Sequence, residues 1–330
     1  MAEHSYQLLA TDPAGTTTDL TQRVGTLSWS GSVKQMAREL SVTLAAPTDG
    51  SLPEPPTALG NGAALLVDSK ARFTGVLTGR QKATQGSVME LSAMDRGWYL
   101  AQNEGWYSFS GVTPEAAVKR VCGDFGIPVG ALAATGKTVS RKFAGAPLYK
   151  IIDTLYTLAA EQDGRRYLAR FDGEGKLEVA EKPTAAALEL APGKNLQTLT
   201  VKEDVSKLQN RVAIYSRDGR LVRTVEDGES VERYGSLQHV LTQRDGADAG
   251  AEARAWLEDN GLSQTMTVEC LGHPDLISGS AVLLRGNTAG VAGLCWIDSD
   301  THTWKNGQYF CRLTLNFRNL MNETSAGSEL

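Results

Sequence analysis

The sequence predicts a mainly β protein with an α+β insertion between two groups of strands. Residues 265–272, TMTVECLG, alternate apolar and polar side chains, as a strand with one buried face does. Asn306-Gly307 separates two further stretches of this kind and is a strong hairpin signal. Between residues 113 and 159 the apolar spacing changes to three and four, which indicates helices. Each strand group is expected to form a β-barrel. For the first group a β-sandwich is the alternative.

Composition limits the class of protein. The 330 residues have room for two or three domains, and a hydrophobic content of 41% with 22% charged residues is typical of soluble proteins. The net charge of −5 and the absence of basic clusters argue against a nucleic-acid-binding surface. The sequence begins without a signal-peptide pattern, and no stretch approaches the roughly 18 apolar residues of a membrane helix. We therefore expect a soluble protein made inside a cell, with no membrane insertion.

The four cysteines are scattered and form no CxxC pair. Buried free thiols in a reducing cytosol are favoured over disulfides or a zinc site. In the hairpin register set by Asn306-Gly307, Cys311 lies opposite His302 and not opposite Cys295. This register argues against a Cys295–Cys311 disulfide.

The first predicted domain, residues 1–96, consists of short strands separated by turn residues. The expected strands are residues 5–12, 20–29, 38–46, 64–68, 73–82 and 87–93. A loop at residues 50–62 is rich in proline and glycine, and clustered prolines cannot join the interior of a sheet. The loop is expected to be either an exposed arm that binds a neighbour or a connector.

The second predicted domain, residues 97–187, is a small α+β domain. Thr113 and Pro114 have the residue types of a helix N-cap and first helical position. A second helix is expected to begin near Pro147, because apolar residues follow at spacings of three and four. Residues 165–182 are expected to form a hairpin.

The third predicted domain, residues 188–320, is a second β-barrel with an inserted helix. Asp218-Gly219 marks the turn of a long hairpin at residues 208–226, and residues 249–260 have the pattern of a helix. The closing strands follow from residue 265 onward. Residues 321–330 are polar and are expected to be a flexible tail.

The motif search finds no catalytic, cofactor-binding or metal-binding residues to commit to. Asp298, Asp300 and His302 would share one face of a strand and are the strongest metal candidate, but a solvated outer face near the hairpin turn is favoured. Asp172–Gly175 resembles half of a calcium loop and is interpreted as a turn. The chain has no GxSxG, GxGxxG or HExxH motif, and no two carboxylates stand out as a glycosidase pair.

Four stretches in the last third of the chain, taken in order, carry a family resemblance. They are residues 211–242, the helix with AxxxAxxWL, GHPDLISGSAVLL and WIDSDTHTWKNGQYFCRLTLNF. The matched features are Ser230 to Tyr234-Gly235, Gly272-His273-Pro274 to Gly279, and Ser299–His302 to Asn306-Gly307 and Tyr309. Together they resemble the XkdQ/YqbQ-like phage tail hub proteins, which are related to contractile-tail baseplate hubs and the late control protein D family.

This resemblance implies two tail-tube-like β-barrels flanking the α+β domain. It further implies a non-enzymatic homotrimer that joins a six-fold tail tube to a three-fold spike and lines a central channel. The implied partners are the tail tube protein, a spike protein and other baseplate proteins, with DNA only as passing cargo. The implied location is the host cytoplasm during assembly, and then the baseplate of a virion or tail-like particle.

Two other functions stay open at this point. One is a tail-associated peptidoglycan hydrolase, which would need a carboxylate pair or a Cys-His pair in a cleft. The other is a host-glycan-binding tail-tip module, which would need clustered exposed aromatic residues. The six tryptophans are dispersed in the sequence, which favours core and interface anchors.

Overall fold

The computed structural model describes residues 4–47, 53–83, 86–243, 248–286 and 289–329. Its elements are mostly strands, with five α-helices among the described residues, so the mainly β class is confirmed. The chain divides into two compact units, residues 200–266 and the remainder, and each is described by itself. No helix in the described part of the chain is long and apolar enough to span a membrane.

The strands predicted in the first 96 residues are all present. A run of antiparallel neighbours has the order β4-β7-β6-β5-β1-β2. The strands are β1 (Tyr6–Thr11), β2 (Thr17–Asp19), β3 (Val24–Ser32), β4 (Glu39–Ala45), β5 (Gly62–Val67), β6 (Lys70–Lys82) and β7 (Val88–Asp95). Alternate side chains, such as Leu40, Leu65 and Phe73, are buried in one core. The period-2 pattern therefore identified the strands correctly.

The closing strands are also present, and their hairpin has the predicted register. They are β18 (Ser263–Leu271), β19 (Ala281–Leu284), β20 (Gly293–Lys305) and β21 (Gln308–Asn316). Asn306 and Gly307 have φ angles of 52° and 72°, the left-handed values that a two-residue type I′ turn requires. His302 pairs with Cys311 across the hairpin, as expected from the sequence.

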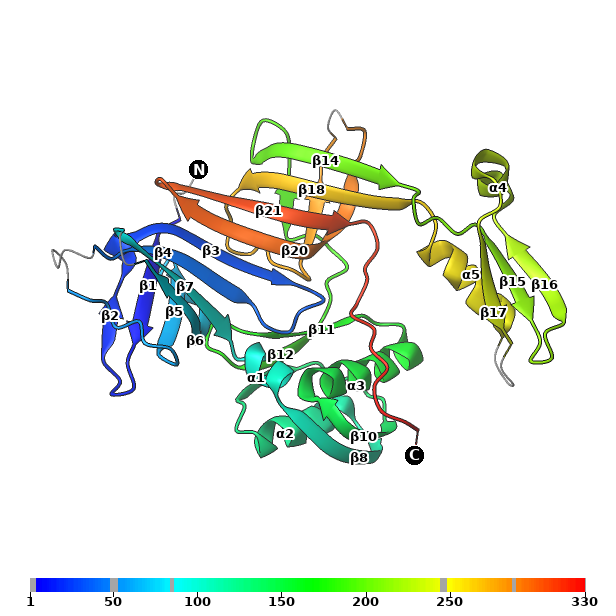
Figure 1. Cartoon of the computed structure of the whole chain (residues 1–330), viewed down its shortest axis with the longest axis horizontal. Coiled ribbons are helices and arrows are strands. Elements are labelled where there is room, and N and C mark those ends of the chain that lie inside the picture. The colour runs from blue at the N-terminus through cyan, green and yellow to red at the C-terminus, as the bar shows by residue number, and fades with distance from the viewer. Residues whose placement is uncertain (1–3, 48–52, 84–85, 244–247, 287–288, 330) are drawn as a thin grey trace. The chain divides into compact units, whose positions relative to one another are not determined.

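The two strand groups join in one sheet instead of forming two closed barrels. β20 pairs antiparallel with β3, and the continuous order is β14-β18-β21-β20-β3-β4-β7-β6-β5-β1-β2, where β14 is Leu196–Asp204 (Figure 1). The short strand β13 (Leu188–Leu190) pairs with β19 off this path. No closed barrel is found among the described residues. The barrel expectation is corrected because β20 uses its second edge to pair with β3 of the other group.

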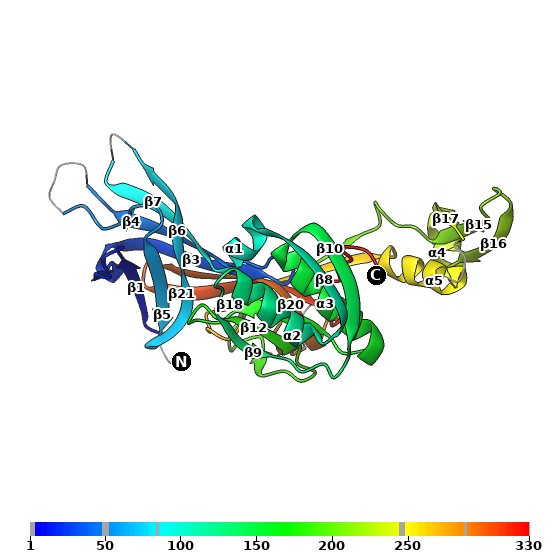
Figure 2. The ribbon, with the colours of Figure 1, turned by 90° about the horizontal axis from the view of Figure 1, so that it is seen from below.

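The α+β part contains both predicted helices and the predicted hairpin. Its elements are α1 (Gly97–Gln102), β8 (Glu104–Val112), α2 (Pro114–Asp124), β9 (Val129–Leu132), β10 (Val139–Pro147), α3 (Leu148–Asp163), β11 (Tyr167–Phe171) and β12 (Leu177–Glu181). Thr113 caps α2 by accepting a hydrogen bond from the backbone N–H of Ala116, with Pro114 as the first helical residue. The sequence missed the β8–β10 pair, which lies beside α2 and α3 in Figure 2.

The Asp172–Gly175 segment is a turn, as predicted. The Asp172 Oδ1 atom accepts hydrogen bonds from the backbone N–H groups of Glu174 and Lys176, at 2.9 and 2.8 Å. The Asp172 carboxylate is therefore hydrogen-bonded within its own loop, as in an Asx-turn.

Residues 200–266 form a unit with their own sheet and core. β15 (Arg211–Tyr215) lies between β16 (Leu221–Glu226) and β17 (Gln238–Thr242), and α4 (Gly228–Tyr234) connects β16 to β17. α5 (Ala249–Asp259) packs on the sheet through Ala253. The insertion between β14 and β18 is therefore larger than the single helix expected. The predicted division at residues 96, 187 and 320 stays a prediction.

The C-terminal tail contacts the α+β part through its described residues. Its backbone pairs with β10 through Lys142 and Ser328, and Met321 and Ala326 pack against the core of the α+β part. In Figure 1 this segment, in red, runs down to α3. Composition alone does not show that polar groups elsewhere in the fold hydrogen-bond the tail backbone, and the flexibility of the tail stays a prediction.

Two glycines in helices of the α+β part should respond oppositely to alanine. A Cβ atom at Gly97 would lie 2.4 Å from the Met36 carbonyl oxygen, whereas one at Gly123 would meet nothing within 4 Å. We expect Gly97→Ala to lower the free energy of unfolding by about 1–3 kcal/mol through overpacking. Gly123→Ala is the control and should raise it by about 0.5–1 kcal/mol. Urea unfolding measures both, and equal effects would contradict the close packing at Gly97.

Candidate functional site: a buried charge network beside an open pocket

A β-bulge in β20 turns Asp300 and His302 into the protein interior. The pairing with β21 shifts between Ile297 and Ser299, so the buried positions change from Cys295 and Ile297 to Asp300, His302 and Trp304. Asp300 is 1% exposed and His302 is 0% exposed. The expectation that these residues form a solvated outer face is therefore wrong. Because Asp298 lies at the bulge, the three do not form one face.

Asp300 forms a buried ion pair with Arg38, which immediately precedes β4. Arg38 donates to both carboxylate oxygens, at 3.1 Å to Oδ1 and at short range to Oδ2. The backbone N–H of Ser278 donates a third hydrogen bond to Oδ1 at 2.6 Å. Burial alone raises the pKa of Asp300, but the Arg38 charge and the His302 contact outweigh it and hold the pKa well below its usual range. The carboxylate is therefore ionised in the folded protein.

His302 extends this ion pair into β21. Its Nε2 lies 3.3 Å from Asp300 Oδ2, and its Nδ1 lies 2.8 Å from the Tyr309 hydroxyl and 3.1 Å from Cys311 Sγ. The ring also lies against Trp29 of β3, with centroids 4.7 Å apart. Burial lowers the pKa of His302, but the neighbouring Cys311 and Asp300 outweigh burial and raise the pKa to about 9. We call Arg38, Asp300, His302, Tyr309 and Cys311 the buried network.

The order Cys311–His302–Asp300 matches the nucleophile, base and orienting carboxylate of a cysteine hydrolase. Its environment does not match that role. All three side chains are at most 1% exposed. Burial first of all, with the nearby Cys270 thiol, raises the pKa of Cys311 well above its usual value. A protonated thiol that solvent does not reach is a structural residue, not a nucleophile.

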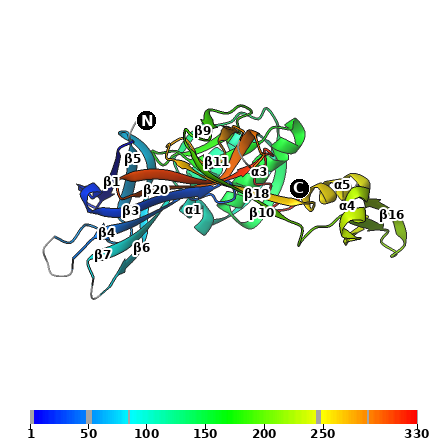
Figure 3. The same cartoon turned by 90° about the horizontal axis from the view of Figure 1, so that it is seen from above.

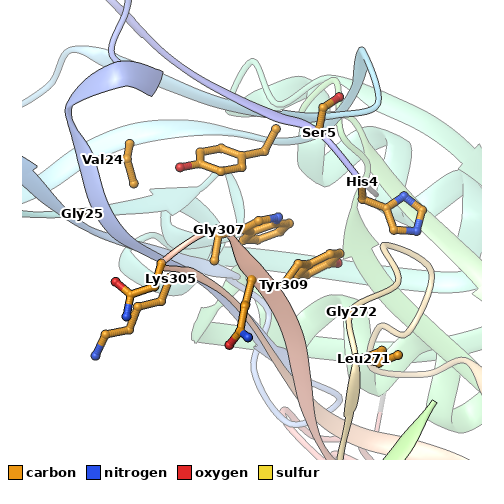
Figure 4. Close-up of a pocket in the computed structure, with 13 residues that line it drawn as sticks. His4, Ser5, Val24, Gly25, Leu271, Gly272, Lys305, Gly307 and Tyr309 are labelled. Carbon is orange, nitrogen blue, oxygen red and sulfur yellow. The ribbon is translucent and has the colours of Figure 1, made fainter. Parts of the chain in front are cut away.

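An open pocket lies beside the buried network. It has a volume of about 840 Å³ and is lined by the N-terminal residues, the start of β3, the end of β18 and the β20–β21 hairpin (Figure 4). Tyr309 belongs to both features, because its ring stacks on Trp304 with centroids 4.1 Å apart while its hydroxyl reaches His302. Gly272 covers the Tyr309 ring, since a Cβ there would lie 2.2 Å from it.

The other candidates from the sequence are separate from this site. All four cysteines are free and buried, as predicted. Burial raises the pKa values of Cys122 and Cys295 to about 11. Within the described residues no group of three or more His, Cys, Asp or Glu side chains is arranged to hold a metal ion. Sequence reasoning missed Arg38, Trp29 and Tyr309, and no sequence signal marks them, because Arg38 and Asp300 are 262 positions apart.

The buried ion pair gives a direct test. Asp300→Asn should lower the free energy of unfolding by about 3–5 kcal/mol, because it leaves the Arg38 charge buried without its counter-ion. Asp298→Asn, two residues away, should cost less than about 1 kcal/mol, since an amide oxygen can still accept from the Asn316 side chain. Urea unfolding of both variants checks this, and a similar small loss for both would refute the importance of the pair.

Comparison with known proteins places the chain in a family. The YQBQ-like family model matches residues 27–316. Protein XkdQ of the phage-like element PBSX from Bacillus subtilis is 25% identical over 264 residues, which cover 77% of this chain and 80% of XkdQ.

Solved structures show the same fold. The 43 kDa tail protein of prophage MuSo2 from Shewanella oneidensis has a TM-score of 0.73 at 14% identity, covering 94% of this chain and 97% of that protein. The E. coli protein c3393 is a type VI secretion component described as structurally similar to the T4 bacteriophage tail proteins gp27 and gp5. It has a TM-score of 0.54 at 13% identity, and the match covers 93% of this chain and 76% of c3393. The chain belongs to the YQBQ-like family, and its fold is that of phage tail proteins.

Proposed function

We propose that this protein is a structural baseplate hub of a phage tail or phage-tail-like particle. Three copies form a ring that joins the six-fold tail tube to the three-fold spike and surrounds a central channel. Family membership supports this role, as do the relatives, which include a prophage tail protein and a protein described as similar to gp27 and gp5. Each copy contributes two groups of strands to the ring.

The observation that carries the proposal is the open sheet. β14 and β2 stand at the two ends of the strand order, and among the described residues neither has a further strand on its outer side. Unpaired edges are usually covered by another chain or protected from pairing. Identical copies that pair through different edges form a closed ring when the rotation allows. A trimeric ring would therefore cover these edges.

The proposed partners are the tail tube protein, a spike protein and other baseplate proteins. Assembly takes place in the host cytoplasm, and the finished hub resides in the baseplate of the particle. The net charge of −5 suits a channel wall, because like charges repel passing DNA. DNA is thus a passing cargo and not a bound ligand.

Two segments are proposed as ring contacts. The hairpin at residues 208–226 exposes Leu221 and Val222, at 52% and 51% of their surface. The proline-rich loop at residues 50–62 is the second, although residues 50–52 lie outside the described part of the chain. Neighbouring exposed aliphatic side chains are a feature of protein interfaces.

Neither alternative function gains a specific observation. A hydrolase needs an accessible nucleophile, and the Cys311–His302–Asp300 arrangement is buried. A glycan site needs a cluster of exposed aromatic faces. Trp304 is only 4% exposed and stacks on Tyr309, and the exposed Trp106 has Lys142 Nζ over its ring, 5.1 Å from the centroid.

The hub proposal predicts the mass of the protein in solution. Light scattering should find three times the 35.3 kDa of the monomer, either for the protein alone or once its spike protein is added. Val222→Glu should shift the mass toward the monomer, because it places a charge in the proposed contact. Val88→Glu is the matched control, at an equally exposed valine of β7, and should leave the trimer intact. A monomer that ignores the spike protein would refute the proposal.

The absence of hydrolase activity is tested separately. Incubation of the protein with purified peptidoglycan should release no soluble fragments, because the Cys311 thiol is buried and protonated. Cys311→Ala should behave identically. Fragment release by the unmodified chain that Cys311→Ala abolishes would instead establish the hydrolase.

A further inference from the structure

The C-terminal segment, residues 320–328, lies in a groove formed by α3 and the edge of β10. We call this segment the strap. Only Met321 and Ala326 of the strap pack against the hydrophobic core of the α+β part. Most of its hydrogen bonds to the rest of the protein involve its backbone. A segment with few apolar anchors opens at low free-energy cost compared with a core strand.

Two threonines of α3 bind the middle of the strap. Thr157 Oγ1 accepts a hydrogen bond from the backbone N–H of Thr324 at 3.2 Å, and Thr154 Oγ1 accepts one from Ala326 at 3.0 Å. Thr154 and Thr157 are 1% and 7% exposed. The two threonines lie three positions apart on α3 and bind the backbone N–H groups of alternate residues of the strap. The groove therefore recognises the backbone of the strap.

β10 binds the far end of the strap. Lys142 and Ser328 exchange two backbone hydrogen bonds of 2.9 Å, as neighbouring strands do. Arg141 Nε donates to the Ala326 carbonyl at 2.8 Å. Gly327 has a φ of 72°, and a Cβ there would lie 2.2 Å from the Lys142 carbonyl oxygen, so only glycine fits this position.

The near end of the strap covers two ionisable groups. Lys182 Nζ donates to the Leu320 carbonyl oxygen, and Lys182 is 3% exposed. Asn322 Nδ2 donates to Asp153 Oδ2 at 2.9 Å beside a small cavity of about 20 Å³. The Asp153 side chain is partly exposed. The atoms packed around its carboxyl group nevertheless remove enough water to raise its pKa to about 7. No cation is paired with it in the described structure.

The remaining ionisable groups around Asp153 do not compensate its charge. Tyr156 of α3 and Tyr167 of β11 line the same cavity, and burial raises the pKa of both, so both are neutral at physiological pH. On the strap, Glu323 is exposed and lies 4.0 Å from Arg166. Burial lowers the pKa of Lys182, with Asp298 and Arg166 as its charged neighbours.

We propose that the groove of α3 and β10 is a docking site for a peptide segment, that the strap is its occupant, and that the strap is a releasable latch that binds more tightly at acidic than at alkaline pH. In the docked state, burial beside Asn322 keeps Asp153 mostly protonated below about pH 7. In the released state water reaches the carboxyl group, which then ionises.

The sign of the pH effect follows from proton binding. The pKa of Asp153 is about 7 in the docked state, and a carboxyl group in water has a pKa of about 3.9. Between these values the docked state holds a proton that the released state lacks, so docking weakens as the pH rises and levels off above about 7. Lys182 has the opposite effect on docking, and only at alkaline pH. Its pKa is lowered in the docked state, so loss of its proton at high pH favours docking.

Hydrogen exchange of the full chain tests this proposal. Mass spectrometry at about pH 6 and about pH 8.5, corrected for intrinsic exchange, should show up to about tenfold more frequent opening of residues 320–328 at the higher pH. Protection of the core of α3, measured in the same samples, should change far less. Equal protection of the strap at both pH values would overturn the proposal.

Three variants identify the group responsible. Asp153→Asn is neutral at every pH and can still accept from Asn322, so its strap should stay protected at both pH values; loss of protection at both would refute the proposal. Glu323→Gln removes an exposed carboxylate of the strap and should keep the full pH response; loss of the response would assign it to Glu323 instead. Gly327→Ala should release the far end at both pH values through its clash with Lys142.

Discussion

The ion pair between Arg38 and Asp300 is the contact on which the arrangement of the larger unit depends. It joins the segment before β4 to β20, at the place where the two strand groups become one sheet. Buried ion pairs are favourable only when further hydrogen bonds satisfy the charged atoms. The Ser278 backbone supplies such a hydrogen bond to Asp300, and His302 Nε2 lies 3.3 Å from the carboxylate. The Trp29 ring lies 4.2 Å from the Arg38 guanidinium. The pairing of β3 with β20, and hence the position of the hairpin and its pocket, is stabilised by this network.

The same network shows why the geometry of side chains does not by itself define a catalytic site. Cys311, His302 and Asp300 stand in the order of a catalytic triad, at distances of 3.1 and 3.3 Å. Burial keeps the thiol protonated and denies substrate access. The contacts instead join β20 to β21 and orient Tyr309 toward Trp304. These polar contacts agree with the register that the Asn306-Gly307 turn sets.

The protein treats its strand edges in two different ways. The outer edge of β10 is covered by the chain's own C-terminal segment, through Lys142 and Ser328. β14 and β2 end the large sheet without a further neighbour among the described strands. In Figure 3 the long strands β3 and β20, which pair with each other, run side by side. An edge covered within the chain is protected from wrong pairing, whereas an open edge suits assembly with other copies. The proposed ring would give the open edges their partners.

Local patterns by themselves determined most strands of the large sheet, the helices α2 and α3 and the closing hairpin. Alternation of side chains identifies strands, and Asn306-Gly307 sets the pairing of His302 with Cys311, because both depend on neighbouring residues alone. Only the tertiary structure decided that β20 pairs with β3, that the bulge after Ile297 turns Asp300 and His302 inward, and that the polar tail docks on α3. Each of these outcomes depends on groups distant in sequence, such as Arg38, Trp29 and Thr154. Burial and hydrogen-bond satisfaction act only once those groups meet in the fold.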